Sequence, residues 1–375
     1  MFGARLTLFR LLGFEVRLDA SWLILAVLLT WSLARGYFPA YYPNLAPETY
    51  WSMGVIGALG LFASIVLHEL AHSVVARRYG LPMRGITLFI FGGVAEMEDH
   101  PPTPKSEGMM AIAGPIASYA LALAFYLLYL AGAGGGLPDG ITGVLGYLAF
   151  INVVLATFNL IPGFPLDGGR VLRSILWAWK NDLRWATRMA SAIGGGFGVV
   201  LITLGVFNAI SGNFIGGVWY FVLGLFLWGA AKAHYQQVVV REALRGEPVR
   251  RFMKADPVVV PPSLSIRRFV EEYVYGFHYK MYPVVHENGR LLGCVTVDRL
   301  KEIPREEWDR RAVGEVMGGC SPENTVRPDA DVTEALKLMQ RTGSSRLIVA
   351  EGDRVVGMVA LKDLLRYVSL KAELE

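Results

Sequence analysis

The chain has 375 residues, of which 53% are hydrophobic, and its mean hydropathy of +0.40 argues against an entirely soluble protein. Its net charge of +4 is too small to indicate direct nucleic-acid binding, and such an excess in a membrane protein usually lies in cytoplasmic loops. Two cysteines, Cys294 and Cys320, exclude a disulfide framework and fit a reducing compartment.

Long apolar runs occupy the chain up to about residue 235 and predict six membrane-spanning helices. Each run is near the length that a helix needs to cross the hydrocarbon core of a bilayer. The predicted spans are Ala20–Tyr37, Trp51–Val75, Met109–Ala131, Ile141–Ile161, Ala186–Ile210 and Ile215–Ala233. We therefore expect residues 1–235 to form a membrane domain, 236–252 a helical linker and 253–375 a soluble α/β domain.

Positive charges alternate between the loops that join these spans. Residues 38–50, 132–140 and 211–214 contain no Lys or Arg, whereas the intervening loops contain several. Cytoplasmic loops of membrane proteins are enriched in Lys and Arg. We therefore expect a multi-pass protein of the cell membrane, with both termini and the C-terminal domain in the cytoplasm.

The second predicted span contains the run His68-Glu69-Leu70-Ala71-His72. Residues i and i+4 share a helix face, so His68 and His72 can present two imidazoles to one metal ion, with Glu69 nearby as a general base. His68 lies about 13 Å along the helix from Arg77, which places the pair inside the membrane, nearer its cytoplasmic face. Ionisable groups at this depth are costly and usually functional. The alternative is two interior histidines satisfied by backbone or by neighbouring helices.

Residues 84–97, after the second span, are rich in β-branched and aromatic residues. They predict short paired strands with a turn or bend at Gly92-Gly93. One interpretation is a structural hairpin packed on the helices. The other is a strand with an exposed edge, to which a further extended segment can add.

The fourth span ends in the run FNLIPGFPLDGGR, residues 158–170. Pro162 and Pro165 stop the helix, and the glycines permit tight backbone geometry. Irregular backbone at membrane depth is tolerated only where it is buried in protein or lines a cavity, so Asp167 can complete a His-His-Asp ligand set. Asn159 is a candidate donor to a developing oxyanion. The alternatives are that Asp167 caps a helix beginning near Gly168 and that Asn159 bonds a neighbouring helix.

Together these two motifs resemble those of the site-2 proteases, which are intramembrane zinc metalloproteases. The resemblance includes Phe91-Gly92-Gly93-Val94 and Ala113-Gly114-Pro115, and it covers most of residues 1–235. It implies one Zn²⁺ per chain, held by His68, His72 and Asp167. It also implies that Glu69 is the catalytic base and that Asn159 steadies the substrate or the oxyanion. Ser118 stands where family members often carry Asn, which puts a packing or substrate contact in question and leaves the expected metal site untouched.

A protease must hold its scissile segment extended, because a helix hides its peptide bonds behind its own hydrogen bonds. The resemblance therefore favours the strands expected over 84–97 as a substrate-binding edge. The candidate substrate-binding residues are Leu88, Phe89, Ile90, Phe91, Gly92 and Gly93.

The C-terminal domain contains an internal repeat. Met253 matches Met317 and Gly293 matches Gly357, both at a spacing of 64 residues. Each copy predicts the order strand, helix, strand, strand, helix. This arrangement resembles a tandem pair of CBS domains, at about residues 253–310 and 313–370.

CBS pairs commonly bind adenine nucleotides through a Gly-x-x-Ser/Thr-x-x-Asp pattern, which is split in this chain. The first copy keeps Thr296 but has Arg299 in the Asp position, with Asp298 one residue earlier. The second copy keeps Asp363, but Ala360 replaces the hydroxyl residue. Thr296, Asp298 and Asp363 are therefore the candidate nucleotide-binding residues, and dimerisation or gating without a ligand is an equal alternative.

The sequence thus predicts a polytopic α-helical membrane protein with about six transmembrane helices and a short β-hairpin region, followed by a soluble α/β tandem CBS domain. The expected function is an intramembrane zinc endopeptidase that cleaves a membrane-embedded or membrane-associated protein, under the control of the CBS pair. The resemblance implies substrates such as an anti-sigma factor or a sigma-factor precursor. Further expected partners are the lipid bilayer and a second copy bound through the CBS domains, but not nucleic acid.

The alternative from another functional class is a membrane transporter or channel gated by the CBS pair, with the histidines as an ion site. No inverted repeat is visible across the six spans, and a Glu directly after the first His suits hydrolysis better than conduction. An inactive relative that only binds membrane clients is a third alternative. The intact HELAH run and Asp167 argue against it.

Overall fold

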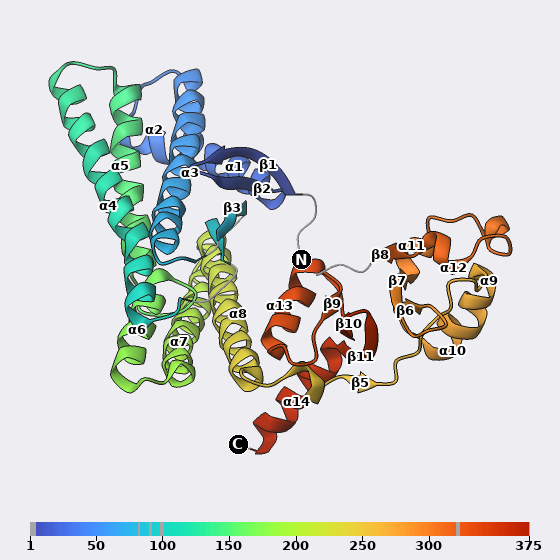
Figure 1. Ribbon diagram of the computed structural model, residues 1–375. Helices are drawn as coiled ribbons and strands as arrows, with labels where there is room; N and C mark the ends of the chain where they lie inside the picture. Colours follow the sequence, from blue (N-terminus) through green and yellow to red (C-terminus); the bar gives the residue numbers. More distant parts are fainter. Residues whose placement is uncertain (1–4, 82, 90–91, 98–100, 320–322, 375) are drawn as a thin grey trace. The chain divides into compact units, whose positions relative to one another are not determined.

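The structure divides into two units, Met1–Gln236 and Gln237–Glu375. It is a computed structural model that describes residues 5–374 apart from 82, 90–91, 98–100 and 320–322. The first unit is helical with one small sheet, and the second consists of short strands and helices (Figure 1). Each unit has hydrophobic cores of its own.

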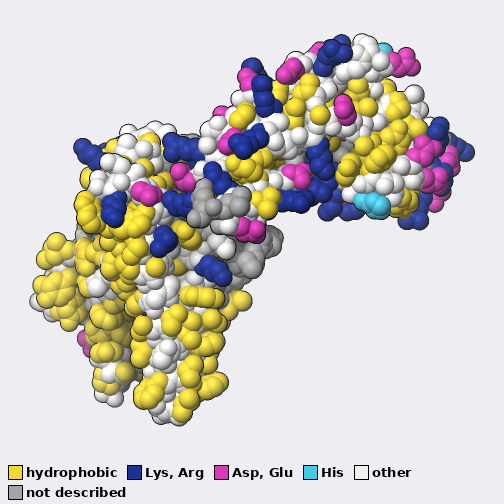
Figure 2. Space-filling view, turned by 90° about the horizontal axis from the view of Figure 1, so that it is seen from below, with side chains coloured by type: hydrophobic (Ala, Val, Ile, Leu, Met, Phe, Trp, Pro, Cys, Tyr) yellow, Lys and Arg dark blue, Asp and Glu magenta, His cyan; other side chains and the backbone are white. Residues whose placement is uncertain are grey.

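Among the described residues, six helical segments are long and apolar enough to cross a membrane, which confirms the six predicted spans. The first segment contains α1 and α2. The helices are α1 (Ser21–Ser32), α2 (Phe38–Tyr41), α3 (Pro47–Arg78), α4 (Pro104–Gly134), α5 (Asp139–Asn159), α7 (Leu183–Ile210) and α8 (Phe214–Leu244). In Figure 2, hydrophobic side chains cover a broad area of this unit, whereas the face of the second unit in view shows charged side chains among hydrophobic ones. An apolar surface of this kind suits contact with lipid.

Local sequence sets where these helices begin and end. α4 starts with Pro104 after a capping box, in which the Thr103 hydroxyl accepts from the Ser106 N–H and the Ser106 hydroxyl accepts from the Thr103 N–H. α8 continues beyond the predicted sixth span to Leu244, as expected for a helical extension. Gly246 follows with a φ of +79°, a left-handed conformation that favours glycine and ends the helix.

The sheet of the first unit has the strand order β1-β2-β3-β4. Its strands are β1 (Arg5–Leu11), β2 (Phe14–Asp19), β3 (Met83–Phe89) and β4 (Gly92–Met97). β3 and β4 pair antiparallel, which confirms the predicted paired strands. The turn or bend predicted at Gly92-Gly93 is wrong, because both glycines belong to β4 and pair with Phe89 and Leu88. β2 pairs parallel to the other side of β3, so β3 is an internal strand and β4 is an edge strand.

The second unit contains two sheets that mix the two repeats. The order β5-β11-β10-β9 joins β5 of the first repeat to β11 of the second, and the order β6-β7-β8 joins β8 of the second repeat to β7 of the first. The strands are β5 (Lys254–Ala255), β6 (Met281–Val285), β7 (Leu291–Thr296), β8 (Gly318–Gly319), β9 (Thr325–Val326), β10 (Arg346–Glu351) and β11 (Arg354–Ala360). The helices are α9 (Ile266–Arg268), α10 (Tyr275–Phe277), α11 (Val297–Leu300), α12 (Val313–Val316), α13 (Val332–Thr342) and α14 (Leu361–Leu374).

Candidate metal centre

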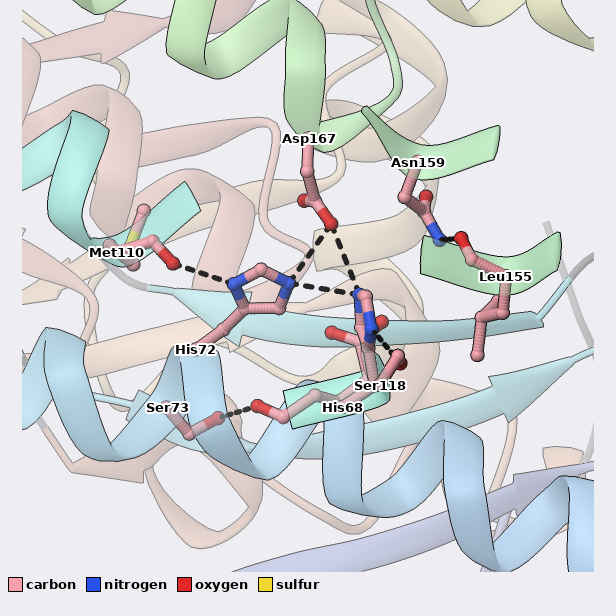
Figure 3. Close-up of polar contacts among 9 residues, drawn as sticks. His68, His72, Ser73, Met110, Ser118, Leu155, Asn159 and Asp167 are labelled. Atoms are coloured by element: carbon pink, nitrogen blue, oxygen red, sulfur yellow. Dashed lines mark hydrogen bonds and ion pairs between the residues drawn. The ribbon is translucent and has the colours of Figure 1, made fainter. Parts of the chain in front are cut away.

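His68 and His72 lie one turn apart on α3, and both are buried, with 3% and 4% of their surface exposed. Their Nε2 atoms are 3.1 Å apart, and Asp167 Oδ2 lies 3.1 Å from each of them (Figure 3). One ligand atom from each of these residues falls within 4.8 Å of the others. The structure therefore brings together the three residues that the sequence singled out as a ligand set.

Asp167 reaches the histidines because the chain turns sharply between α5 and α6 (Asp167–Lys180). A Cβ atom at Gly168 would lie 2.2 Å from the Leu160 carbonyl oxygen, and one at Gly169 would lie 2.3 Å from the Gly163 carbonyl carbon. Both glycines are therefore required for the backbone to fold on itself. The residue before α6 is Leu166, and no side-chain bond caps this helix, so the interpretation of Asp167 as a helix cap is wrong.

Two hydrogen bonds from α4 fix the imidazole rings. The Nδ1–H of His72 donates to the Met110 carbonyl at 2.7 Å, because a carbonyl can only accept, so in the neutral imidazole Nε2 is the nitrogen that is left to bind a metal. His68 Nδ1 lies 2.9 Å from Ser118 Oγ. Bonds of this kind set the tautomer and orientation of metal-binding histidines. The expectation that Ser118 leaves the metal site untouched is therefore wrong, since its hydroxyl contacts a ligand residue.

Gly114 of α4 gives the imidazoles the room they occupy. A Cβ atom at this position would lie 2.2 Å from His72 Nε2 and 2.5 Å from His68 Nε2. The bare backbone of α4 thus forms one wall of the centre. The sequence singled out Ala113-Gly114-Pro115 as a motif, but only the packing of α4 on α3 reveals why Gly114 is there.

Glu69 follows His68 on α3 and lies outside the ligand set. Its carboxylate interacts electrostatically with His72, His68 and Asp167. A Cβ atom at Gly93 would lie 2.8 Å from Glu69 Cγ and 3.3 Å from Glu69 Oε1. The edge strand β4 therefore packs directly against Glu69.

Asn159 is the last residue of α5. Its Nδ2 donates to the Leu155 carbonyl of the same helix at 3.0 Å, and Figure 3 shows its amide turned toward Leu155. Within the described part of the chain, the Asn159 amide bonds Leu155 and none of the three ligand residues. Because this bond runs within α5, the alternative that Asn159 bonds a neighbouring helix is wrong.

The candidate substrate-binding residues fall into three groups. Leu88 is 3% exposed and packs in a core with Val66, Leu70 and Ile86, so its side chain does not face a substrate. Phe89 ends β3, and its ring contacts Phe226 of α8. Gly92 and Gly93 lie on the edge strand β4, whereas Ile90 and Phe91 are outside the described residues.

The candidate nucleotide-binding residues lie apart in the second unit. Thr296 ends β7, and Asp298 is exposed and paired with Lys301 at 2.6 Å. Asp363 lines a cavity of about 110 Å³ together with Tyr279 and Arg346. Thr296 and Asp298 are not among the described residues that line this cavity.

The donor set fits a zinc ion. Two imidazole nitrogens and one carboxylate oxygen are the ligand types found in catalytic zinc sites, which keep a fourth position for water or substrate. Because Gly114 has no side chain, a space remains beside the two Nε2 atoms that a single methyl group would fill. The arrangement can therefore hold a divalent metal beside a carboxylate that is able to accept a proton.

Two protein-family models match this chain. The model of peptidase family M50 matches residues 56–143 and 136–204. The CBS domain model matches residues 249–306 and 313–370, which confirms the tandem repeat.

Several similar proteins cover most of the chain. A putative zinc metalloprotease of Mycobacterium tuberculosis, Rip3, is 35% identical over 362 residues, or 96% of this chain and 92% of that protein. A putative zinc metalloprotease of Synechocystis sp. is 33% identical over 364 residues, covering 96% of this chain and 95% of that protein. The solved site-2 protease of Methanocaldococcus jannaschii aligns with a TM-score of 0.44 at 28% identity, over 62% of this chain and 95% of that chain.

Proposed function

The chain belongs to peptidase family M50, the site-2 proteases, and we propose that His68, His72 and Asp167 hold its zinc ion. It is a membrane-integrated zinc metalloprotease with a C-terminal CBS pair, so the alternative of a gated channel or transporter is wrong. One observation carries the proposal: the three ligand atoms lie together, and two of them belong to a helix that is long enough to span a membrane and also carries Glu69. The reaction is hydrolysis of a peptide bond within or near the bilayer.

The chain's own residues supply proton transfer and orientation. Zinc, when bound, is a Lewis acid that lowers the pKa of water and polarises the scissile carbonyl. Glu69 takes the proton of the attacking water and returns it to the leaving amine. The bonds from Met110 and Ser118 keep the imidazoles turned toward the centre. Asn159 bonds the Leu155 carbonyl, so donation to an oxyanion requires its side chain to rotate.

The experiment that tests this function is cleavage in vesicles. The full chain is reconstituted with a membrane-protein client, and the appearance of product is followed before and after a zinc chelator and then after added zinc. We expect cleavage to stop with the chelator and to return with zinc, because the ligand set holds the ion on which hydrolysis depends. Cleavage that resists complete removal of the metal would contradict the proposal.

The edge strand β4 is the structure's best candidate to hold the substrate. β3 is paired on both sides, so of these two strands it is β4 that offers an edge to which an extended segment can add. Gly93 of β4 packs on Glu69, so a segment added at this edge runs beside the proposed base. The substrate-binding role therefore falls to Gly92 and Gly93 rather than to Leu88 or Phe89.

Proline substitution tests the edge. Phe89 and Gly92 face each other where the two strands meet, so by the alternation of an antiparallel ladder the Val94 N–H turns toward β3 and the Ala95 N–H turns toward the open edge. Ala95→Pro therefore removes a backbone donor at that edge, and we expect cleavage to fall at least about tenfold, the loss of roughly one hydrogen bond to a substrate, while zinc stays bound. Leu8→Pro in β1, the opposite edge of the same sheet, is the matched control and should retain cleavage. Equal cleavage by the two variants and the wild type would rule out strand addition at β4.

The substrate proposed for this site is a protein anchored in the same bilayer, because two of the three ligand residues, His68 and His72, lie on α3, a helix long enough to span it. By resemblance, anti-sigma factors and sigma-factor precursors are the candidates. We propose that both termini and the CBS pair lie in the cytoplasm, because Lys and Arg gather in alternate loops between the spans. A fusion of a reporter enzyme to the C-terminus tests this orientation: a periplasmic signal would contradict it.

The CBS pair is proposed to control access to the site. The cavity at Asp363 is about 110 Å³, below the roughly 300 Å³ of a typical small-molecule site, and the Arg346 guanidinium lies 4.1 Å above the Tyr279 ring beside it. Binding of an adenine nucleotide therefore requires these side chains to separate, and gating or dimerisation without a ligand remains the equal alternative.

Adding AMP or ATP to the full chain distinguishes control by a bound nucleotide from control without a ligand. Nucleotide binding predicts a calorimetric signal that Asp363→Ala removes, together with a changed cleavage rate. Ligand-free gating predicts no such signal but a changed rate after deletion of residues 253–375. If neither nucleotide nor deletion changed the rate, control by the CBS pair would be dropped.

A further inference from the structure

A buried ion pair lies outside the metal centre. Arg173 of α6 is 1% exposed and Glu107 of α4 is fully buried. Arg173 Nε donates to Glu107 Oε1 at 2.7 Å, and Nη2 donates to the same oxygen. A buried charge pair is weak grounds for a gain in stability, because desolvation offsets most of the attraction. Its position therefore calls for another explanation.

Arg173 also joins the other two helices at this end of the unit. Its Nη1 lies 2.9 Å from His234 Nε2 of α8 and 3.5 Å from Thr187 Oγ1 of α7. Arginine has only donors, so His234 Nε2 must accept and its imidazole is neutral. One guanidinium thus links α4, α6, α7 and α8.

Arg173 and His234 both contact the ring of Phe164, which is buried three residues before Asp167. The guanidinium carbon lies 4.8 Å from the centre of the ring, within the range of a cation–π contact. The His234 ring stacks on Phe164 with 4.1 Å between the ring centres and 24° between their planes. The side chain of Phe164 is therefore held by the same two residues that bond each other.

The backbone of Phe164 is held from α7. Its N–H donates to the Ala190 carbonyl at 3.2 Å, and a Cβ atom at Gly194 would lie 1.9 Å from the Phe164 carbonyl oxygen. Ring and backbone are thus both fixed just before the residue that faces the two histidines. A shift of Phe164 would be passed to Asp167 through only two intervening residues.

We propose that Arg173 and His234 are positioning residues, which hold Phe164 so that the Asp167 carboxylate stays in place opposite His68 and His72. This inference rests on the proposed role of Asp167 as a zinc ligand. His234 lies on α8. The position of α8 therefore bears on the ligand set.

The test measures zinc affinity of the purified full chain by competition with a chromophoric chelator. His234→Ala removes both the stack and the bond, and His234→Phe keeps the stack alone. We expect His234→Ala to bind zinc at least about tenfold more weakly, in the range found when a partner of a metal ligand is removed, and His234→Phe to lie between it and the wild type. Tyr235→Ala, the next residue on α8, is the matched control with unchanged affinity.

A second variant separates positioning from folding. Arg173→Met alone leaves Glu107 as an unpaired buried charge and can prevent folding, whereas Arg173→Met with Glu107→Gln removes both charges. We expect the double variant to unfold near the wild-type temperature with the metal stripped, yet to bind zinc at least about tenfold more weakly. Wild-type affinity in His234→Ala, or in a folded double variant, would overturn the inference. A wild type that binds no zinc would overturn the proposed function instead.

Discussion

Gly114→Ala is expected to empty the metal centre. The added methyl group would lie 2.2 Å from His72 Nε2 and 2.5 Å from His68 Nε2, distances at which the atoms cannot coexist. A close-packed interior does not absorb such an overlap without moving the groups involved. Both imidazoles must turn away from Asp167, and zinc affinity should fall by more than about a hundredfold, beyond the 10- to 100-fold cost of losing an outer partner of a ligand.

The measurement is zinc content and zinc affinity of the purified variant, with helix content by circular dichroism as a check on folding. Gly134→Ala is the matched control on the same helix, because an added Cβ there meets no described heavy atom within 4 Å. This control should bind zinc and cleave substrate like the wild type. If Gly114→Ala did the same, α4 would not form the wall of the centre.

Asp167→Asn is expected to abolish zinc binding while leaving the fold intact. The amide has nearly the shape of the carboxylate but lacks the charge that makes Asp a zinc ligand. Asn also serves as a helix cap as well as Asp does, so a residue that only capped α6 would tolerate this change. We therefore expect a folded protein whose zinc affinity is lower by more than about a hundredfold and whose cleavage is lost.

The control for Asp167→Asn is Asp182→Asn. Asp182 does cap a helix, since its carboxylate accepts from the Trp185 N–H at 2.8 Å at the start of α7. The change should leave both zinc binding and cleavage near wild-type values, because Asn preserves the cap. Wild-type zinc binding by Asp167→Asn would remove Asp167 from the ligand set and return it to a structural role.

Local patterns were enough to predict much of the fold. Apolar runs of sufficient length predicted the six spans, and the spacing of His68 and His72 predicted that they share a face of α3. These features depend on residues a few positions apart, so a single sequence contains them. The strand pairing of β3 with β4 is of the same kind, because the two strands are neighbours in the sequence.

The walls of the metal centre could not be predicted in this way. Ser118 contacts His68 from 50 residues away, and Gly114 meets both imidazoles only because α4 packs on α3. Which residues face each other across two helices depends on their crossing angle and rotation, which side-chain packing decides. The sequence therefore identified the groups that bear the chemistry, but not the backbone and hydroxyl that surround them.

Which strand lies at the edge of the sheet could not be predicted from the sequence either. β2 pairs parallel with β3 although the histidine helix separates them in the chain, and this pairing buries Leu88 and leaves β4 as the edge. In the second unit, β5 of the first repeat pairs with β11 of the second repeat, and β8 of the second repeat pairs with β7 of the first. Each sheet therefore contains strands of both repeats. Pairing between distant segments is selected by the packing of the whole unit rather than by local preference.

The role of Glu69 as the base of a zinc protease is tested by comparing the wild type with Glu69→Gln in vesicles that contain a membrane-protein substrate. Zinc per chain and the rate of cleavage are determined on the same samples. We expect about one zinc per chain in both proteins, because Glu69 lies outside the ligand set, and cleavage at least about a hundredfold slower in the variant, the usual cost of losing a general base. A variant that cleaves at the wild-type rate, or a wild type that cleaves without zinc, would contradict that role.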